Sequence, residues 1–577
     1  MLIRKLFLLI VFGLILITIP SCTKSTEPET TDNPTIDTDT DPTDDNSSDH
    51  EDTGDYTWNE SDVIPIVLNG TSITANTVNA TISGSTITIT AAGTYRFSGT
   101  LTNGQIIVNA GDDDLVRLIL NGVDIKNSTT APVYIRNSDK TIVVLADNTT
   151  NSLTDPGTYI LADATIDEPN AALYSKSDLT IYGNGSLTVT GNYNDGIACI
   201  DGLIIRDAVI TVNSFDDGIR GKDYLIVRNG NITVNAKGDG LKSDNSEDAT
   251  RGYVSVESGS INIISTSDGI SAQTDVIIAD GTINITSGGG SSRTVSGTLS
   301  AKAIKGTASV TISGGTFIIS SADDALHSNG SVIINGGTLS LSSADDGIHA
   351  DSFVKITGGE VNITKCYEGI ESPIITVNNG IVNMISSDDG FNATKGLGGE
   401  QNDGSVLTIN GGTFYINSSN GDGLDSNGNI VMTGGTVIVH GPKSQPEVGT
   451  DYNGTFNISG GILILTGPNS GRMIEATSSS SAQYSILATA STGLTSSTLF
   501  HVQDASGNEL ITFQPVRNVY YLVFSSPSLQ SGASYSIYTG GTSTGTNNNG
   551  MYSGGVYSGG TLKKTFAISG KVTNVSF

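Results

Sequence analysis

The chain has 577 residues, of which 15% are charged and 70 are glycine. Its 58 acidic residues outnumber its 28 basic residues, and the net charge of −30 argues against nucleic acid or a bare anionic membrane as a partner and favours bound cations. The many Thr, Ser, Asn, Ile and Val residues, together with the glycines, are typical of a β-rich protein with frequent turns.

Residues 1–22 have the pattern of a bacterial lipoprotein signal peptide. Arg4 and Lys5 precede an apolar run that ends in Ile-Pro-Ser-Cys, which fits a lipobox with Cys22 as the lipidated residue. An uncleaved transmembrane anchor is the alternative, and the Cys at the end of the run favours the lipoprotein. We therefore expect an exported protein that is held at the bacterial outer membrane or cell surface through Cys22.

Residues 23–56 are acidic, contain proline and have almost no aliphatic side chains. Such a segment cannot bury a core, so we expect a disordered acidic linker.

A phrase of the type Asp-Asp-Gly-Ile recurs from residue 194 to residue 424. Its second position falls at 195, 217, 239, 268, 302, 324, 346, 368, 389 and 422, so the commonest step is 22 residues. A Gly-Gly phrase recurs out of phase with it, as in SGGT at 313, NGGT at 335 and TGGE at 357. This period is too short for helical-hairpin repeats or propeller blades. Each period reads as three short alternating strands separated by turns, which predicts an all-β, right-handed parallel β-helix with coils of about 22 residues.

The alignment of the repeats predicts the core. One buried column should contain Ile197, Ile219, Leu241, Ile270, Ile304, Leu326, Ile348, Ile370, Phe391 and Leu424. Cys199 and Cys366 would lie roughly 34 Å apart along the stack at the strand spacing of a sheet. A disulfide spans at most about 7 Å between Cα atoms, so the two cysteines should be unpaired and buried.

The expected domain organisation follows from the extent of the repeats. Residues 57–540 should form the parallel β-helix, with a closing β region from about residue 470. Residues 541–577 should form a Gly/Ser-rich loop and a final strand. Insertions at 243–253, 287–300, 395–405 and 441–454 interrupt the period, and in stacked repeats such insertions often build the binding face.

Stacking the repeats would place acidic side chains about 5 Å apart, and each like-charge pair would cost about 3 kcal/mol at an effective dielectric constant near 20. Protons or cations must neutralise them, and Ca²⁺ suits carboxylate and backbone oxygens outside the cell best. The candidate ligands are Asp216, Asp217, Asp239, Asp268, Asp323, Asp324, Asp345, Asp346, Glu368, Asp388, Asp389 and Asp422. The alternative is that each Asp simply forms a turn and is solvated, as in many Asp-Gly turns.

Several basic and aromatic residues could contact a ligand. Lys242 lies three residues after Asp239, where it could act as the base of a calcium-assisted β-elimination; charge balance is the other interpretation, for Lys222, Lys242, Lys302 and Lys305 alike. His327 and His349 stack without a third soft ligand, which indicates surface or ligand-contacting residues. The chain has one Trp, so sugar contacts would come from residues such as Tyr193, Tyr224 and Tyr253.

The phrases GDGLKSD, SAKAIKG, YEGIES, GDGLDSNG and the pair SADDALHSN and SADDGIHAD resemble the bacterial carbohydrate-binding β-helix domain family that is related in fold to family 9 pectate lyases. The resemblance runs from about residue 57 to 540. It implies a right-handed β-helix with bound calcium that binds plant cell-wall glycans, both cellulose and polygalacturonate. It also implies calcium ligands among the acidic turns, which supports Asp216, Asp217, Asp239, Asp268 and the group at 323–346.

These observations give three hypotheses for the function. The first is a calcium-containing, non-catalytic polysaccharide-binding lipoprotein for cellulosic or acidic glycans. The second is a pectate lyase in which Lys242 is the catalytic base. The third is a structural or adhesive surface protein whose partner is another protein.

Overall fold

The computed structural model describes residue 46 and residues 49–161, 165–295, 298–399 and 401–577. The chain divides into two compact units, Met1–Pro42 and Thr43–Phe577, and all described residues belong to the second. The predicted signal peptide, Cys22 and most of the predicted linker lie outside the described residues. Among the residues that are described, no helix has the length and apolar character needed to cross a membrane.

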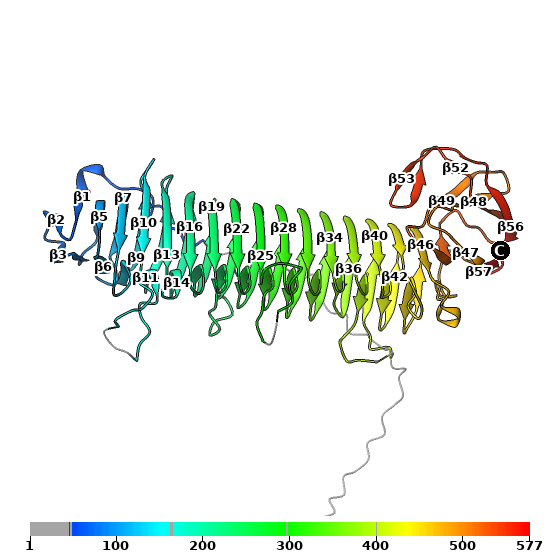
Figure 1. Ribbon diagram of the computed structural model, residues 1–577, viewed down its shortest axis with the longest axis horizontal. Helices are drawn as coiled ribbons and strands as arrows, with labels where there is room; N and C mark the ends of the chain where they lie inside the picture. Colours follow the sequence, from blue (N-terminus) through cyan, green and yellow to red (C-terminus); the bar gives the residue numbers. More distant parts are fainter. Residues whose placement is uncertain (1–45, 47–48, 162–164, 296–297, 400) are drawn as a thin grey trace, which may run out of the picture. The chain divides into compact units, whose positions relative to one another are not determined.

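The described unit is built almost entirely of β-strands, which lie side by side in long series (Figure 1). The regular helical structure of the described residues consists of two single-turn 3-10 helices, η2 (Glu60–Asp62) and η3 (Gly471–Met473).

The first series is one sheet of sixteen strands that are parallel except for the initial hairpin. Its members are β3 (Ala80–Ser83), β4 (Thr86–Ile89), β6 (Gln105–Asn109), β8 (Val133–Asn137), β11 (Ala171–Ser175), β14 (Asp195–Cys199), β17 (Ile219–Gly221), β20 (Leu241–Ser243), β23 (Ile270–Ala272), β26 (Ile304–Gly306), β29 (Leu326–Ser328), β32 (Ile348–Ala350), β35 (Ile370–Glu371), β38 (Phe391–Ala393), β41 (Leu424–Ser426) and β44 (Thr450–Tyr452).

A second series of parallel pairings joins β9 (Lys140–Leu145), β12 (Asp178–Tyr182), β15 (Gly202–Arg206), β18 (Tyr224–Val227), β21 (Tyr253–Val256), β24 (Asp275–Ile278), β27 (Ser309–Ile312), β30 (Ser331–Ile334), β33 (Phe353–Ile356), β36 (Ile374–Val377), β39 (Val406–Ile409), β42 (Asn429–Met432) and β45 (Phe456–Ile458).

The third series joins β10 (Thr150–Thr154), β13 (Ser186–Gly191), β16 (Ala208–Ser214), β19 (Gly230–Ala236), β22 (Ser260–Ser265), β25 (Thr282–Ser287), β28 (Thr316–Ser321), β31 (Thr338–Ser343), β34 (Glu360–Cys366), β37 (Ile381–Ser386), β40 (Thr413–Ser418), β43 (Thr436–His440) and β46 (Ile462–Gly467). The second and third series meet through β7 (Leu115–Lys126), which pairs with both β9 and β10. At the N-terminal end β1 (Ile64–Gly70) and β2 (Ile73–Ala75) form a hairpin, and β5 (Gly93–Leu101) pairs with β1 and β7.

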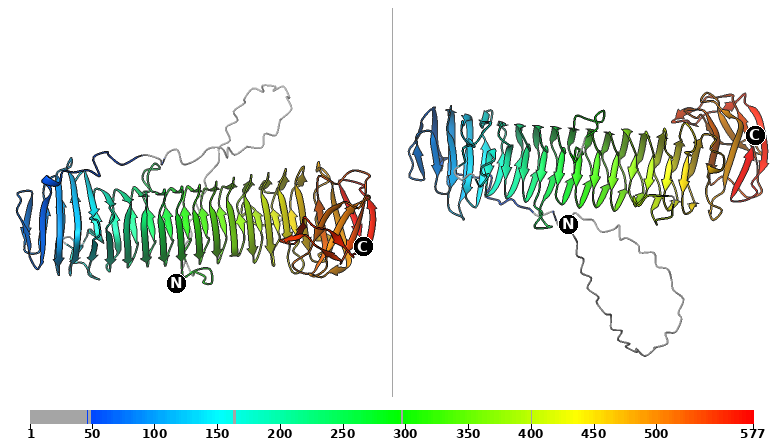
Figure 2. Two further views of the ribbon diagram at one scale, coloured as in Figure 1. Left: turned by 90° about the horizontal axis from the view of Figure 1, so that it is seen from above. Right: turned by 60° about the horizontal axis from the view of Figure 1, so that its bottom comes forward.

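The register of the first series confirms the predicted core column. Ile304 pairs with Leu326, Leu326 with Ile348 and Ile348 with Ile370, and the same register joins all ten positions from Ile197 to Leu424. All ten side chains are fully buried. Because alternate residues of a strand point to opposite faces, each turn of the repeat adds side chains to one continuous apolar interior. The all-β class and the long parallel sheets are therefore confirmed, an arrangement compatible with a β-helix (Figure 2).

The two described cysteines also agree with the prediction. Cys199 and Cys366 are both buried and both free.

Two boundaries differ from the sequence prediction. Residues 49–56 were expected to belong to the disordered linker, but they contact the second series of strands: Glu51 forms ion pairs with Arg206 and Arg228, and Lys140 forms ion pairs with Asp52 and Asp55. The acidic side chains that argued against a buried core instead form ion pairs with basic residues on the sheet.

The stretch 541–560 was expected to be loop, but it contains the short strands β52 (Thr542–Ser543), β53 (Thr546–Asn548), β54 (Met551–Ser553) and β55 (Tyr557–Ser558). The remaining C-terminal strands are β47 (Ser485–Leu494), β48 (Phe500–Asp504), β49 (Glu509–Phe513), β50 (Val519–Ser525), β51 (Ser534–Thr539), β56 (Thr561–Ala567) and β57 (Val572–Ser576). Strand β50 pairs antiparallel with β46 and β47, so the parallel stacking ends there, over a second apolar cluster.

Candidate functional site

A row of carboxylates lies in the turns that lead into the short strands of the first series. We call this row the acidic ladder; it contains Asp195, Asp217, Asp239, Asp268, Asp324, Asp346, Glu368, Asp389 and Asp422. A glycine follows most of these residues because the turn packs tightly on the next one. A Cβ atom on Gly218 would lie 2.3 Å from Val234 Cγ1 and 2.5 Å from the carbonyl oxygen of Gly240.

The ladder carboxylates bind the backbone of the neighbouring turn. The backbone N–H of Asp217 donates to Asp195 Oδ1 at 3.1 Å, that of Asp239 to Asp217 Oδ1 at 2.8 Å, and that of Asp268 to Asp239 Oδ1 at 2.9 Å. The same bond recurs from Asp346 to Asp324 and from Asp422 to Asp389. One oxygen of each of these carboxylates therefore satisfies a buried N–H group, which explains why the phrase repeats with the period of the fold.

Lysine side chains neutralise part of the ladder. Lys242 Nζ lies 2.9 Å from Asp217 Oδ2 and 3.0 Å from Asp239 Oδ2. Burial opposes its charge, but the two carboxylates outweigh burial and raise the pKa of Lys242 above its ordinary value. Lys305 Nζ lies 3.7 Å from Asp268 Oδ2. Lys242 is thus a protonated partner of the ladder.

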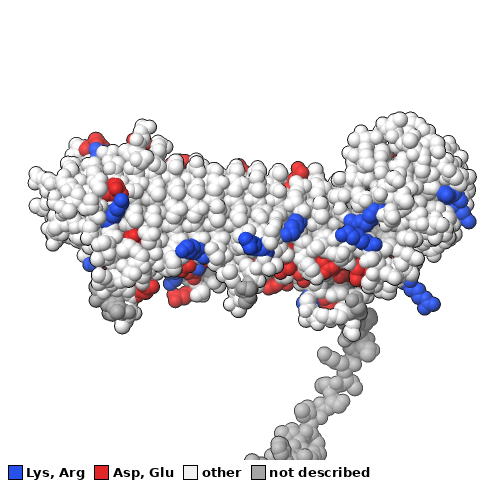
Figure 3. Space-filling view, in the orientation of Figure 1, with Lys and Arg blue, Asp and Glu red and all other residues white. Residues whose placement is uncertain are grey.

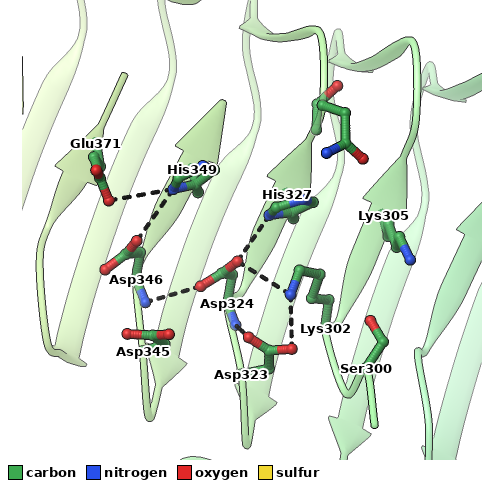
Figure 4. Close-up of polar contacts among 12 residues, drawn as sticks. Ser300, Lys302, Lys305, Asp323, Asp324, His327, Asp345, Asp346, His349 and Glu371 are labelled. Carbon is green, nitrogen blue, oxygen red and sulfur yellow. Dashed lines mark hydrogen bonds and ion pairs between the residues drawn. The ribbon is translucent and has the colours of Figure 1, made fainter. Parts of the chain in front are cut away.

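Lys302 occupies the ladder position of its own turn. Its backbone N–H donates to Asp268 Oδ1 at 2.8 Å, as an Asp would, while its Nζ lies 2.7 Å from Asp323 Oδ2 and 3.4 Å from Asp324 Oδ2 (Figure 4). Because Lys302 offers no carboxylate to the next turn, the N–H of Asp324 donates to Asp323 Oδ1 instead.

Two histidines extend this network. His327 Nδ1 lies 2.8 Å from Asp324 Oδ2, and His349 Nδ1 lies 3.3 Å from both Asp346 Oδ2 and Glu371 Oε2 (Figure 4). Burial opposes the charge of His349, but its hydrogen bonds to Asp346, Glu371 and Asp351 outweigh burial and raise its pKa well above the ordinary value. The two rings are stacked with centroids 5.1 Å apart, and both contact carboxylates rather than open solvent.

The C-terminal end of the ladder is strongly acidic. Burial, together with the charges of Asp425, Asp422 and Glu368, raises the pKa of Asp389 to about 9. Burial, together with Asp425, Asp451 and Glu447, raises the pKa of Asp422 to about 8. At neutral pH these two carboxyl groups therefore favour the protonated form unless a cation offsets their charge.

Within the described part of the chain, three groups of side chains bring ligand atoms within 4.8 Å of one another: Asp323, Asp324 and Asp345; Asp346, His349 and Glu371; and Asp422, Asp425 and Asp451. The ammonium of Lys302 already lies against the first group. The second includes an imidazole that is shared with carboxylates. The third offers carboxylate oxygens alone, which are the donors that Ca²⁺ prefers, so these residues fit a calcium ion best.

Eight of the twelve predicted ligands belong to the ladder, and the other four, Asp216, Asp323, Asp345 and Asp388, each directly precede a ladder residue. Asp217, Asp239, Asp268, Asp324, Asp346 and Asp422 are buried, whereas Asp216 and Asp345 are exposed and Asp323, Glu368, Asp388 and Asp389 are half-buried. Burial and the charge of Asp217 raise the pKa of Asp216. The fold thus brings the predicted ligands together along the ladder, with Asp216 and Asp345 exposed to solvent.

The predicted sugar-contacting residues lie elsewhere. Tyr224 and Tyr253 are buried, with rings stacked 5.9 Å apart, and His50 stacks on Tyr224 at 3.9 Å. They line a cavity of about 290 Å³ together with Asp178, Asp201 and Asp223. This cavity lies beyond the C-terminal ends of the short strands of the first series, whereas the ladder lies at their N-terminal ends.

Two further candidates are placed as follows. Tyr193 donates a hydrogen bond to Asp167 and stacks on Tyr159. Lys222, just after β17, donates its backbone N–H to the carbonyl oxygen of Cys199.

Sequence reasoning missed Glu371, Asp425 and Asp451. Glu371 and Asp425 each lie three residues after a ladder position, and Asp451 pairs with Asp425 in the next strand. All three are in register with Lys242, Lys305, His327 and His349. The spacing that singled out Lys242 after Asp239 would have found Glu371 and Asp425.

Comparison with known proteins gives a family. A family model described as carbohydrate-binding domain-containing protein matches residues 83–347 and 344–564. The chain belongs to this family. A carbohydrate-binding domain-containing protein of Acetivibrio thermocellus is 41% identical over 150 residues, which make up 26% of this chain. This chain spans about half (52%) of the length of that curated relative.

A solved structure is also similar to part of the chain. It is titled as the structure of the polysaccharide lyase-like protein from C. thermocellum, gadolinium derivative. It is 37% identical, covers 39% of this chain and 92% of its own, and has a TM-score of 0.39.

Proposed function

We propose that the protein is a calcium-containing, non-catalytic polysaccharide-binding protein for plant cell-wall glycans, anchored at the cell surface through Cys22. The observation that carries polysaccharide binding is the match of the carbohydrate-binding family model to residues 83–347 and 344–564. The lipobox in the sequence supports the anchor. Incorporation of labelled fatty acid into the wild type, and its loss in Cys22→Ser, tests the anchor separately.

The fold that we propose for the binding body is a right-handed parallel β-helix with coils of about 22 residues. The support is the register itself, because Leu326 pairs with Ile348 and Ile348 with Ile370, each 22 positions further along. Short strands of three series alternate along the chain, as in β29, β30 and β31. Such a body presents the same side-chain position at regular intervals, which suits a polymer with a repeating unit.

Calcium is proposed at the C-terminal end of the acidic ladder, with Asp422, Asp425 and Asp451 as ligands. The support is an all-oxygen donor set around a buried carboxylate whose pKa is raised to about 8 by burial and by further acidic neighbours. Elsewhere the ammonium groups of Lys242, Lys302 and Lys305 lie against ladder carboxylates or their neighbours and supply positive charge there. Bound calcium would supply positive charge to the ladder and could bridge it to an acidic glycan.

A non-catalytic role is supported by the state of Lys242. A lysine that removes a proton from a sugar must be neutral, and neighbouring carboxylates hold the Lys242 ammonium in its charged form. Incubation of the protein with polygalacturonate and calcium should therefore give no unsaturated product that absorbs in the ultraviolet.

The test of the proposed function is retention on insoluble cellulose, polygalacturonate and xylan, with and without chelator. We expect retention on at least one of these glycans, and weaker retention on the acidic glycan after chelation. Absence of retention on all three would contradict the proposal and would favour a protein partner. An ultraviolet-absorbing product would instead favour the lyase.

A further inference from the structure

The outward side of the third series of strands carries little charge: from β13 to β40 its charged strand residues are Glu360 and Lys365, both in β34. We use the name neutral face for the outward side chains of β13 to β40 that lie in register with Thr188 and Thr190. The row through Thr188 reaches Tyr415 of β40 and consists only of Thr, Asn, Ile, Ser and Tyr. The row through Thr190 consists only of Thr, Asn, Ile and Ser as far as Ser342 of β31.

This face stands out in a protein with a net charge of −30. Figure 3 shows it as a broad white band over the middle of the stack, with Lys and Arg below the band and most Asp and Glu along the lower border. A neutral polymer can approach such a surface without desolvating charges, which is costly in the absence of a partner.

The neutral face is hollowed along the stacking direction. One hollow of about 360 Å³ spans β13 to β22, and a second of about 260 Å³ spans β19 to β28. The two share Asn235 and Ile264 in their linings, so they lie next to each other along the stack, and Lys237 also lines the first. A third hollow of about 270 Å³ lies over β34 to β40. The hollows therefore follow one another across successive strands rather than along one strand.

The side chains of the face combine exposed apolar groups with hydrogen-bonding amides. Ile264 is 60% exposed, Ile318 61% and Ile385 50%. Phe215, which follows β16 beside the face, is 55% exposed, and Lys237 Nζ lies 4.6 Å from its ring centroid. Between the isoleucines lie amide pairs, such as Asn284, which donates to Asn262 Oδ1 at 2.9 Å. Sugar rings have apolar C–H faces and hydroxyl edges, and this alternation of apolar and amide groups matches both.

The C-terminal strands bound one end of the face. Asn549 joins Tyr415 in the lining of the third hollow, and Arg517 donates a hydrogen bond to Asn417 Oδ1 beside it. The next outward positions, Ile438 and His440 of β43, are buried. A ligand on the face would thus extend from β40 toward the N-terminal strands.

We propose that the neutral face binds one extended, uncharged polysaccharide chain that lies along the stacking direction across β16 to β37. Successive strands are about 4.8 Å apart, so equivalent side chains recur at intervals comparable to the length of one sugar ring in an extended chain. This assignment rests on the proposed function. It places the binding of neutral glycans on the neutral face and the calcium-mediated binding of acidic glycans at the acidic ladder.

The test compares Ile264→Asp and Ile318→Asp with the matched control Val78→Asp, whose side chain is 96% exposed and lies outside the face. The probes are cellulose and polygalacturonate, in calcium. We expect retention of both face variants on cellulose to fall at least about tenfold, as for loss of a central contact, with retention on polygalacturonate unchanged and the control like the wild type. Far-ultraviolet circular dichroism and melting temperature should match the wild type, since both positions are outward-facing.

Each other outcome overturns the assignment. Unchanged retention of the face variants on cellulose, or an equal loss on both glycans, would show that the face is not the neutral-glycan surface. If the wild type is retained on polygalacturonate but not on cellulose, the assignment of the neutral face is wrong and the proposed function stands. If the wild type is retained on neither glycan nor on xylan, both the assignment and the proposed function are wrong. Concentration-dependent dimerisation in sedimentation, abolished by the same variants, would assign the face to a second copy of the chain.

Discussion

Replacing Asp389 with Asn removes a ladder carboxyl whose ionisation is opposed by burial and by acidic neighbours. The folded-state pKa of this carboxyl is about 9, whereas an unperturbed Asp has a pKa of about 3.9. As the pH rises from 4 toward 9, the unfolded chain releases this proton while the folded protein retains it, so the contribution of Asp389 to stability is present at low pH and is lost with rising pH. At pH 7, which lies about 3 pH units above the unfolded-state pKa, the resulting loss of stability is about 4 kcal/mol, with about 2 kcal/mol as a lower value after solvent screening.

The amide introduced by Asp389→Asn keeps an oxygen that can accept the N–H of Asp422, which lies 2.5 Å from Asp389 Oδ1, so the fold should be preserved. In chelator at pH 7, we expect Asp389→Asn to be more stable than the wild type by about 2–4 kcal/mol, and at pH 4 the two should agree within about 1 kcal/mol. Urea unfolding monitored by circular dichroism measures this difference, and Asp113→Asn, at an exposed position, is the control. Equal pH dependence of wild type and variant in chelator would refute the electrostatic reasoning.

Three further substitutions test other parts of the structure. Lys242→Met leaves Asp217 and Asp239 without the ammonium between them and should lower stability by about 2–3 kcal/mol in chelator, whereas a stability equal to that of the wild type would show that the lysine is dispensable. Gly218→Ala places a Cβ against Val234 and should lower the melting temperature, while Gly54→Ala, which has open space, should not. Glu51→Gln removes the carboxylate that forms ion pairs with Arg206 and Arg228, so limited proteolysis should cleave the segment before β1 faster in this variant. An unchanged rate of cleavage would contradict the observed packing of this segment on the sheet.

The core column could be predicted from the sequence because one aliphatic position recurs in every repeat. Ile304, Leu326 and Ile348 each lie two residues after a ladder position. Because the strands of successive repeats pair in parallel, these three residues are paired with one another in neighbouring strands. The same logic placed Asp324 beside Asp346. Periodicity thus predicted which residues are neighbours.

The sequence did not predict what each ladder carboxylate binds. The bond from the N–H of Asp239 to Asp217 depends on the turn geometry, which the pattern does not contain. Lys302 was recognised as a charge within the ladder, but its double contact with Asp323 and Asp324 depends on side-chain conformation. Residues 49–56 were assigned to a linker because their partners, such as Arg228, lie far away in the sequence and follow no period.

Calcium bound per chain, measured by equilibrium dialysis of the metal-free protein at pH 7, tests most directly whether a cation completes the acidic ladder. We expect at least one calcium ion per wild-type chain, and at least one fewer ion, or clearly weaker binding, in Asp422→Asn, whose amide can still accept the N–H of Val448. Binding of no calcium by the wild type, or the same binding by the variant, would contradict the assignment of calcium to Asp422, Asp425 and Asp451.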